Sequence, residues 1–251
     1  MVISVDMKSL WEIRVQFKLF VLLLISWQPI CHASEKLLVV TEEWPPYNFV
    51  NEHGELDGIA TQNIKKILQH AKIQYEIKLL PWSVGYTLAQ KDPNVLLYTL
   101  YRIPEREDKF KWICPVVQSG GIKAFKLKSR KDIIVNNFDD LKKYSIGVGQ
   151  KNAPYHYLLN KGFEPGKHLD VNSSTETSLR LFLMGRNDIF LQEEAAMAFR
   201  LEKLGSSIEQ VTPLIDLLPN SIEKCAALSL DADDKIINKL QQSIRELNLD
   251  N

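Results

Sequence analysis

The sequence contains 251 residues, of which 45% are hydrophobic and 25% are charged. Its 31 lysine and arginine residues are balanced by 31 aspartate and glutamate residues, so no net positive charge favours nucleic acid or an anionic membrane surface. The length allows one large domain or two lobes of about 100 residues each.

The first 33 residues have the layout of a secretory signal peptide. Basic residues precede an apolar stretch at 19–30, and Cys31-His32-Ala33 follows this stretch. A basic region, a short apolar region and a small residue before the cut are typical of export signals. The apolar run is shorter than the roughly 20 residues that cross a bilayer. We therefore expect cleavage near Ala33 and a periplasmic protein without membrane insertion; an uncleaved anchor and lipid attachment at Cys31 are the alternatives.

After the signal, short apolar runs alternate with helical patterns, which is typical of an α/β protein with largely parallel sheets. Strands are expected at 37–40, 75–80 and 95–101, and helices after Gly58 and over 83–90. The run 95–101 is continuous and predominantly apolar, as in strands that are buried on both faces of a parallel sheet.

A second α/β series follows Gly120-Gly121. Strands are expected at 144–148, 188–191 and 225–230, and helices over 153–159, up to Met184, over 194–204 and from Asp233. Ser173 and Glu176 form a capping box for the helix that ends near Met184, and Gly185 is its C-terminal cap. Two such series without a flexible linker predict two lobes that share strands at a hinge.

Two cysteines follow the signal, Cys114 and Cys225. In an oxidising compartment an even number of cysteines can form a disulfide. The sequence does not place their Cα atoms within the ~7 Å that a bridge requires. A disulfide and two separately buried thiols are therefore both open.

The sequence contains no GxSxG, HExxH, P-loop or GxGxxG motif. The histidines after the signal show no metal-ligand spacing, and their polar or helical contexts favour solvated surface positions: His53, His70, His156 and His168. We therefore expect no catalytic residue, metal or cofactor.

Three features mark candidate ligand contacts. Trp44 and Tyr47 flank two prolines that fix the backbone after the first strand, at the edge where open α/β sheets bind ligands. Arg106 follows a buried strand, and its planar guanidinium suits a carboxylate; Arg102 is the competing candidate. Glu193 also follows a strand, and either receives an ammonium group or favours the N-terminus of the next helix. The alternatives are a core tryptophan and surface arginines.

The order of these motifs resembles the family 3 extracellular solute-binding proteins, the polar amino-acid receptors of ABC importers. The resemblance runs from the end of the signal almost to the C-terminus. It rests on Trp44–Tyr47, Gly54–Gly58, Ile103–Glu107, Trp112 and Pro115, Ser119-Gly120, Ile146–Val148, and Gly185–Asp188 followed by Glu193. It implies a two-lobed α/β fold with a mostly parallel, helix-flanked sheet in each lobe and two crossing strands as the hinge. One lobe would comprise 34–117 and 224–251, and the other 118–223.

The resemblance also implies ligand contacts between the lobes. Arg106 stands where the family grips the α-carboxylate of the ligand, and Glu193 stands where an acid, usually aspartate, receives the α-amino group. The other implied contacts are Trp44, Tyr47, Trp82, Thr99, Tyr101 and Asn152. Glu193 is one methylene longer than aspartate, and Lys151-Asn152-Ala153 replaces a Gly-Thr-Thr-like loop. These departures concern the ligand more than the fold.

The sequence therefore predicts a periplasmic receptor that captures a small polar ligand, an amino acid or related carboxylate, for ABC-type uptake. We expect a monomer that partners an ABC permease or a sensor receptor. Two alternatives belong to other functional classes. One is a ligand-sensing protein without a permease, and the other is a cyclohexadienyl-dehydratase-like enzyme with Glu193 as general acid.

Overall fold

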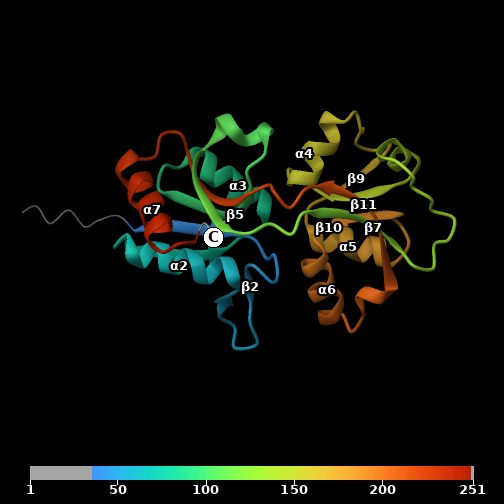
Figure 1. Ribbon diagram of the computed structural model, residues 1–251, viewed down its shortest axis with the longest axis horizontal. Helices are drawn as coiled ribbons and strands as arrows, with labels where there is room; N and C mark the ends of the chain where they lie inside the picture. The colour runs from blue at the N-terminus through green and yellow to red at the C-terminus, as the bar shows by residue number, and fades with distance from the viewer. Residues whose placement is uncertain (1–35, 250–251) are drawn as a thin grey trace, which may run out of the picture. The chain divides into compact units, whose positions relative to one another are not determined.

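The computed structural model describes residues 36–249, and the predicted export signal at 1–33 lies outside this range. The described residues belong to one compact unit, which contains two five-stranded sheets (Figure 1). No helix within this range combines the length and apolar character needed to cross a bilayer.

The first sheet has the strand order β4-β1-β5-β12-β6. Its strands are β1 (Leu37–Thr41), β4 (Tyr75–Leu79), β5 (Val95–Tyr101), β6 (Lys111–Val117) and β12 (Lys224–Leu228). Strand β1 runs parallel to β4 and β5, whereas β12 runs antiparallel to β5 and β6. The chain thus returns near its end to complete a sheet that it began near its start.

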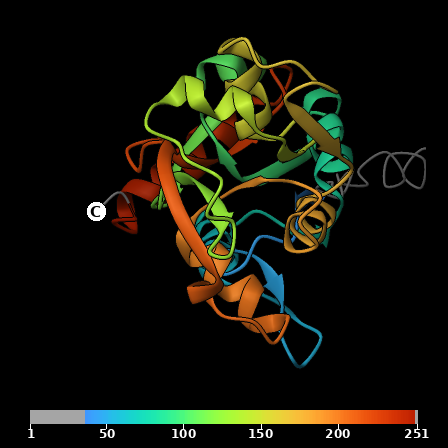
Figure 2. The ribbon, with the colours of Figure 1, turned by 90° about the vertical axis from the view of Figure 1, so that its right-hand side faces the viewer.

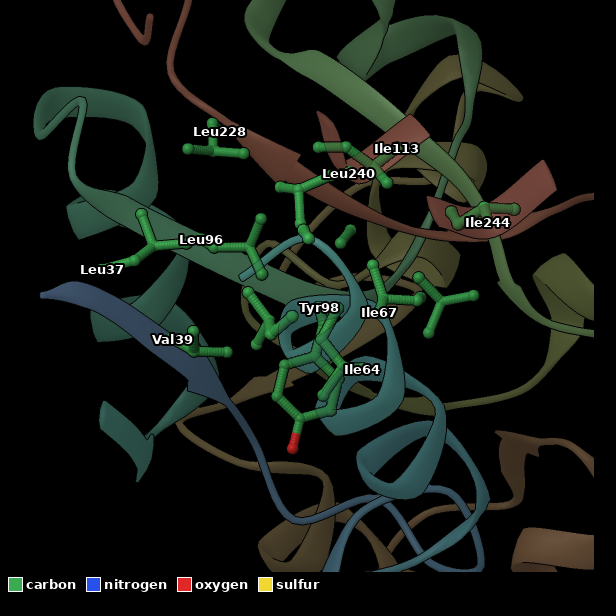
Figure 3. Packing of buried hydrophobic residues seen from close by; sticks show 14 of the residues in the cluster. Leu37, Val39, Ile64, Ile67, Leu96, Tyr98, Ile113, Leu228, Leu240 and Ile244 are labelled. Carbon is green, nitrogen blue, oxygen red and sulfur yellow. The ribbon is translucent and has the colours of Figure 1, made fainter. Parts of the chain in front are cut away.

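Helices cover both faces of this sheet. They are α2 (Ile59–His70), α3 (Trp82–Lys91) and α7 (Asp234–Glu246). Ile64 and Ile67 of α2 and Leu240 of α7 pack against Val39 and Leu96 of the sheet (Figure 3). Burial of each such side chain contributes about 1.5–3 kcal/mol. The stripes of apolar residues at helical spacing in the sequence therefore become one continuous core.

The second sheet has the strand order β11-β7-β10-β8-β9. Its strands are β7 (Ile122–Leu127), β8 (Ile146–Gly149), β9 (Leu169–Asn172), β10 (Ile189–Gln192) and β11 (Val211–Leu218). Strand β8 runs parallel to β9 and β10, and β7 runs antiparallel to β10 and β11. Its main helices are α4 (Ala153–Asn160), α5 (Thr175–Leu183) and α6 (Glu194–Lys203).

Shorter elements connect these layers. They are the hairpin of β2 (Phe49–Val50) and β3 (Leu56–Asp57), and the 3-10 turns η1 (Pro104–Lys109), η2 (Phe138–Lys143) and η3 (Ile208–Gln210). Phe49 of this hairpin contacts Phe199 of α6, with ring centroids 5.1 Å apart. Figure 2 shows the ribbon of the hairpin, in blue, near the orange helices. Elements that lie beside different sheets are therefore in direct contact.

The expected α/β alternation is observed, with several local differences. Strands β6, β7, β9 and β11 were not expected, and β6 and β11 contain Pro115 and Pro213, a residue that argues against a strand in sequence. The N-cap of α5 is Ser174, whose hydroxyl accepts a hydrogen bond from the Thr177 N–H at 3.1 Å. The capping box expected at Ser173 is therefore wrong by one residue. The lobe boundaries at 117 and 223 stay a prediction.

Cys114 of β6 and Cys225 of β12 form a disulfide, with Cα atoms 4.5 Å apart. It joins adjacent strands that are 111 residues apart in sequence. The Glu223 carboxylate lies near both sulfurs, but sulfurs joined to each other offer no thiolate to a metal ion. Of the two alternatives left by the sequence, the structure contains the disulfide.

Replacing both cysteines with alanine should lower the free energy of unfolding by about 2–4 kcal/mol, because a long loop is no longer closed in the unfolded chain. Urea unfolding at neutral pH measures this change. A reductant should destabilise the native protein and leave the double variant unaffected. A difference within about 0.5 kcal/mol, the size of an ordinary surface substitution, would contradict a stabilising bridge.

Candidate functional site

A cavity that is partly open to solvent lies between elements of the two sheets. Its first-sheet side is formed by the ends of β1 and β5 with η1 and α3, and its second-sheet side by β10 and the N-termini of α4 and α5. The predicted ligand contacts that line it are Trp44, Trp82, Thr99, Tyr101, Arg106 and Asn152. Tyr47 and Glu193 do not line it.

Arg106 is the most unusual charge in this cavity, because its side chain is buried without an acidic partner. It is 1% exposed, and its Nη1 and Nη2 donate to the carbonyls of Tyr101 at 3.2 Å and Lys151 at 2.9 Å. Its Nε has no hydrogen-bond partner among the described residues. Its guanidinium carbon lies 5.0 Å from the ring centroid of Trp82. Burial lowers the pKa of Arg106 to about 10, so it remains a cation at neutral pH.

Arg102, the competing candidate, is in a different environment. Its side chain is solvent-accessible, and its Nε donates to Glu107 at 2.9 Å. The salt bridge and the exposure leave it no role in the cavity. The position of the two arginines therefore favours Arg106 for an anion inside the cavity.

Thr99 reaches the cavity through a bulge in β5. The register with β12 shifts here, because Cys225 lies opposite Leu100 and Ala226 lies opposite Tyr98. Thr99 has a φ of 65°, a conformation that costs a non-glycine residue about 1–3 kcal/mol. Its hydroxyl is buried and has no partner among the described residues. The bulge thus redirects a hydroxyl donor into the cavity.

The second-sheet side presents helix N-termini. Asn152 is the N-cap of α4, where its Oδ1 accepts from the Tyr155 N–H at 2.9 Å, and Thr175 begins α5. Both lie at the cavity wall, so the positive ends of two helix dipoles face it. The Asn152 oxygen therefore caps α4, a role that the sequence did not predict for this residue.

Two histidines differ from the solvated positions expected for them. His156 of α4 is half-buried, and burial together with Arg106 lowers its pKa to about 4. It is therefore neutral at physiological pH. His168 is buried, and its Nδ1 accepts from the Glu164 N–H at 3.0 Å. The burial of both rings comes from tertiary packing, which the local sequence around each histidine does not indicate.

Glu193 lies beside the cavity in a separate buried cluster. It is the N-cap of α6 and fully buried, and its two oxygens lie 2.7 and 2.8 Å from Nζ of Lys224. The hydroxyls of Tyr47 and Tyr101 donate to the same carboxylate. Burial and the neighbouring Glu193 raise the pKa of Tyr47, which keeps its phenol protonated as a donor. The carboxylate proposed for a ligand amine is thus occupied by the chain itself.

Aromatic rings enclose the Lys224 ammonium. Its Nζ lies 3.4 Å from the ring centroid of Tyr47, 5.0 Å from that of Trp44 and 5.5 Å from that of Tyr101. Such faces attract a cation, although burial still lowers the pKa of Lys224 to about 8. A Cβ at Gly120 would approach Glu193 Oε2 to 3.2 Å, so the glycine leaves room for the pair.

Two further charged residues of the cavity, Glu42 and Arg200, were not expected from the sequence. Arg200 of α6 is 7% exposed; its Nη1 lies 3.2 Å from Glu176 Oε2, and its Nη2 donates to the Glu43 carbonyl at 2.8 Å. Glu42 directly follows β1, and its carboxylate has no hydrogen-bond or ion-pair partner among the described residues. Glu42 could have been identified from the sequence as a candidate cavity residue, because it follows the end of a predicted strand. Nothing in the sequence distinguishes Arg200 from the other residues of its helix.

The comparisons with known proteins agree with this architecture. The model of the family "bacterial extracellular solute-binding proteins, family 3" matches residues 37–251. A "probable amino-acid ABC transporter-binding protein" of Haemophilus influenzae is 26% identical over 241 residues, which cover 90% of this chain and 88% of that protein.

Solved structures share the fold. The sensor domain of a histidine kinase with similarity to periplasmic binding proteins gives a TM-score of 0.75 at 15% identity, covering 85% of this chain and 90% of that one. An ancestral arginine-binding protein bound to arginine gives 0.74 at 17% identity, covering 87% and 95%. At these identities the likeness establishes the periplasmic-binding-protein fold, as predicted.

Replacing Lys224 with methionine should destabilise the protein by about 3–5 kcal/mol, because Glu193 would be left buried without its counterion. The double variant Lys224→Met, Glu193→Gln should recover most of this loss, since the amide still accepts hydrogen bonds from the tyrosines. Urea unfolding of both single variants and the double variant forms a double-mutant cycle. Additive effects would show that the two side chains do not depend on each other.

Proposed function

The chain belongs to the bacterial extracellular solute-binding proteins of family 3, and we propose that its cavity captures a small ligand with a carboxylate, first of all an amino acid, for uptake through an ABC permease. The name of the Haemophilus influenzae relative and the arginine bound to the ancestral protein support an amino acid. In this proposal the chain works in the periplasm as a monomer, after export directed by residues 1–33.

The buried guanidinium of Arg106 carries the proposal. An arginine that is 1% exposed and donates hydrogen bonds to carbonyls but has no ion-pair partner among the described residues keeps a charge in a poorly solvated place, which is costly. A carboxylate on its free Nε would compensate that charge with a charge-assisted hydrogen bond. The α4 and α5 N-termini, which favour negative charge, support the same sign of ligand.

Neutral groups around the cavity suit the rest of such a ligand. The Thr99 hydroxyl and the Trp82 indole N–H are buried donors without partners among the described residues. The rings of Trp44 and Trp82 and the side chain of Leu191 add apolar lining. A small molecule with a charged end and a compact side chain fits this combination better than a fully apolar one.

We propose that capture closes two lobes, 34–117 with 224–251 and 118–223, around the ligand. Arg106 belongs to the first segment, and Asn152 and Thr175 of the cavity wall belong to the second. A ligand that contacts both segments favours the closed form, so closure is a shift in population. A permease or a sensor receptor would then recognise the closed form.

The enzymatic alternative receives little support from the site. A general acid must reach the atom that it protonates, whereas Glu193 lies outside the cavity and is paired with Lys224. Sensing remains the other use of the same binding event, and the sensor domain of the histidine kinase shares the fold. The permease is preferred because the relative from Haemophilus influenzae is named as a transporter component.

A thermal-shift screen of the mature protein against the twenty amino acids and small dicarboxylates tests the proposal. A compound at 100 times its Kd should add about 2.7 kcal/mol to the stability. Arg106→Ala should weaken binding of that compound about 30-fold or more, because the carboxylate loses a buried charged partner. Isothermal titration calorimetry measures the change in Kd.

Arg102→Ala is the matched control, since it removes an arginine from the same segment but outside the cavity. Its Kd should stay within about twofold of the native value, because a surface substitution away from the cavity changes the free energy by only about 0.5 kcal/mol. An unchanged Kd in Arg106→Ala would refute the assignment of the site. No shift with any compound would refute the proposed ligand class.

A further inference from the structure

We propose that Glu42, and not Glu193, receives the ammonium group of the ligand, whose carboxylate lies on Arg106. The inference rests on the proposed function and narrows it to zwitterions with adjacent opposite charges. It assigns a binding role to a residue that the sequence motifs did not single out. In this inference, Lys224 affects ligand recognition because it occupies the Glu193 carboxylate.

The first step of the argument is that Glu193 has no free capacity. Lys224 Nζ lies within 2.8 Å of both carboxylate oxygens, and both oxygens also accept a tyrosine hydroxyl. Both ionic side chains are 0% exposed. A ligand ammonium could reach this carboxylate only by displacing Lys224, which would then be a buried cation without a partner.

The second step concerns the position of Glu42. Glu42 directly follows the last residue of β1. It therefore lies at the C-terminal edge of the strands, where sheets of this kind bind ligands. It lines both the inner cavity and an adjoining outer cavity, as do Trp82 and Arg200. Glu42 therefore lies along the route between solvent and Arg106, where a ligand passes and comes to rest.

The third step is the balance of charge. Glu42 is half-buried without a hydrogen-bonded or ionic partner among the described residues. Burial raises its pKa to about 7, although the charges of Arg200 and Arg106 act in the opposite direction. A ligand carboxylate on Arg106 would cancel part of that attraction and add like-charge repulsion. An ammonium group beside the carboxylate removes this conflict, because it gives Glu42 a direct counterion.

The proposal has a pH dependence with a definite sign. An ammonium group binds the ionised form of Glu42, so the pKa of Glu42 falls on binding and a proton is released. Affinity for a zwitterion should be nearly constant above about pH 8 and fall below it, by about 10-fold between pH 8 and pH 6. An acid without the ammonium should bind no more weakly at pH 6 than at pH 8.

The other charged or titratable groups around Glu42 do not produce this profile. Arg106 of η1, with a pKa of about 10, stays charged throughout, and His156 of α4, with a pKa of about 4, stays neutral. Glu43 is paired with Lys203 at 3.0 Å, and Glu176 of α5 is paired with Arg180 and Arg200, each at 3.2 Å. Glu42 is the group among these whose pKa of about 7 lies within the range.

The test compares amino acids with the acids that lack only the α-ammonium. The probes are L-glutamine with glutaramate, L-glutamate with glutarate, L-leucine with isocaproate, and L-arginine with δ-guanidinovalerate. Calorimetric Kd values are measured at pH 6 and pH 8 for the native protein, Glu42→Gln and Glu55→Gln. Glu55 is exposed in the β2–β3 hairpin, so its variant removes the same charge away from the cavity.

In the native protein we expect an amino acid to bind at least about 10-fold more tightly than its paired acid at pH 8, the energy of a hydrogen bond to a charged group. Glu42→Gln should lose this preference and the pH dependence, while binding the paired acid as well as the native protein or better. Glu55→Gln should retain both properties.

Three results overturn the inference in distinguishable ways. If the native protein prefers amino acids and Glu42→Gln keeps that preference, another group receives the ammonium while the proposed function stands. If the acids bind the native protein as tightly as the amino acids, no group recognises the ammonium, while the proposed capture of a carboxylate ligand stands. If no probe of either kind binds the native protein, the proposed function fails, and this inference fails with it.

Discussion

A fully buried ion pair between Lys224 and Glu193 fixes the centre of this molecule. It joins the first residue of β12, in the first sheet, to the N-cap of α6, beside the second sheet. Removing two charges from water costs several kcal/mol each, and an isolated pair seldom recovers that cost. Here the tyrosine hydroxyls and aromatic faces supply additional favourable contacts. The requirement to satisfy this pair holds Tyr47, Tyr101 and Trp44 in place, and Tyr101 and Trp44 also form the cavity wall.

Arg106, in a distant part of the sequence, presents the opposite electrostatic situation. Like Lys224 it is a buried cation that belongs to the first sheet's part of the sequence, but it has carbonyls rather than a carboxylate as acceptors. The protein therefore neutralises one buried cation internally, whereas the other is the cation that we propose for an anionic ligand. This difference lies in the partners of the two cations and not in the residue types.

The sequence predicted the elements far better than the contacts between them. The apolar run 95–101 became β5 with the same limits, because strand burial is visible in local composition. Arg106 was favoured over Arg102 by its place in a family motif, and the structure puts it at the cavity. Lys224 carried no such signal, since its significance comes from Glu193, 31 residues away in sequence. The Thr99 bulge also depends on pairing with β12, which local patterns do not encode.

The two buried cations would act in opposite directions on closure of the proposed receptor. If the lobes close as proposed, closing would bring Lys224 and Glu193 together and would stabilise the closed form even when no ligand is present. Closing would also remove Arg106 from water without supplying an anion, which would oppose the closed form until a carboxylate arrives. A ligand can shift such an equilibrium only by its different affinities for the two forms. In this proposal the internal pair would lower the energy that the ligand must provide, while Arg106 would make the remaining energy specific for an anion.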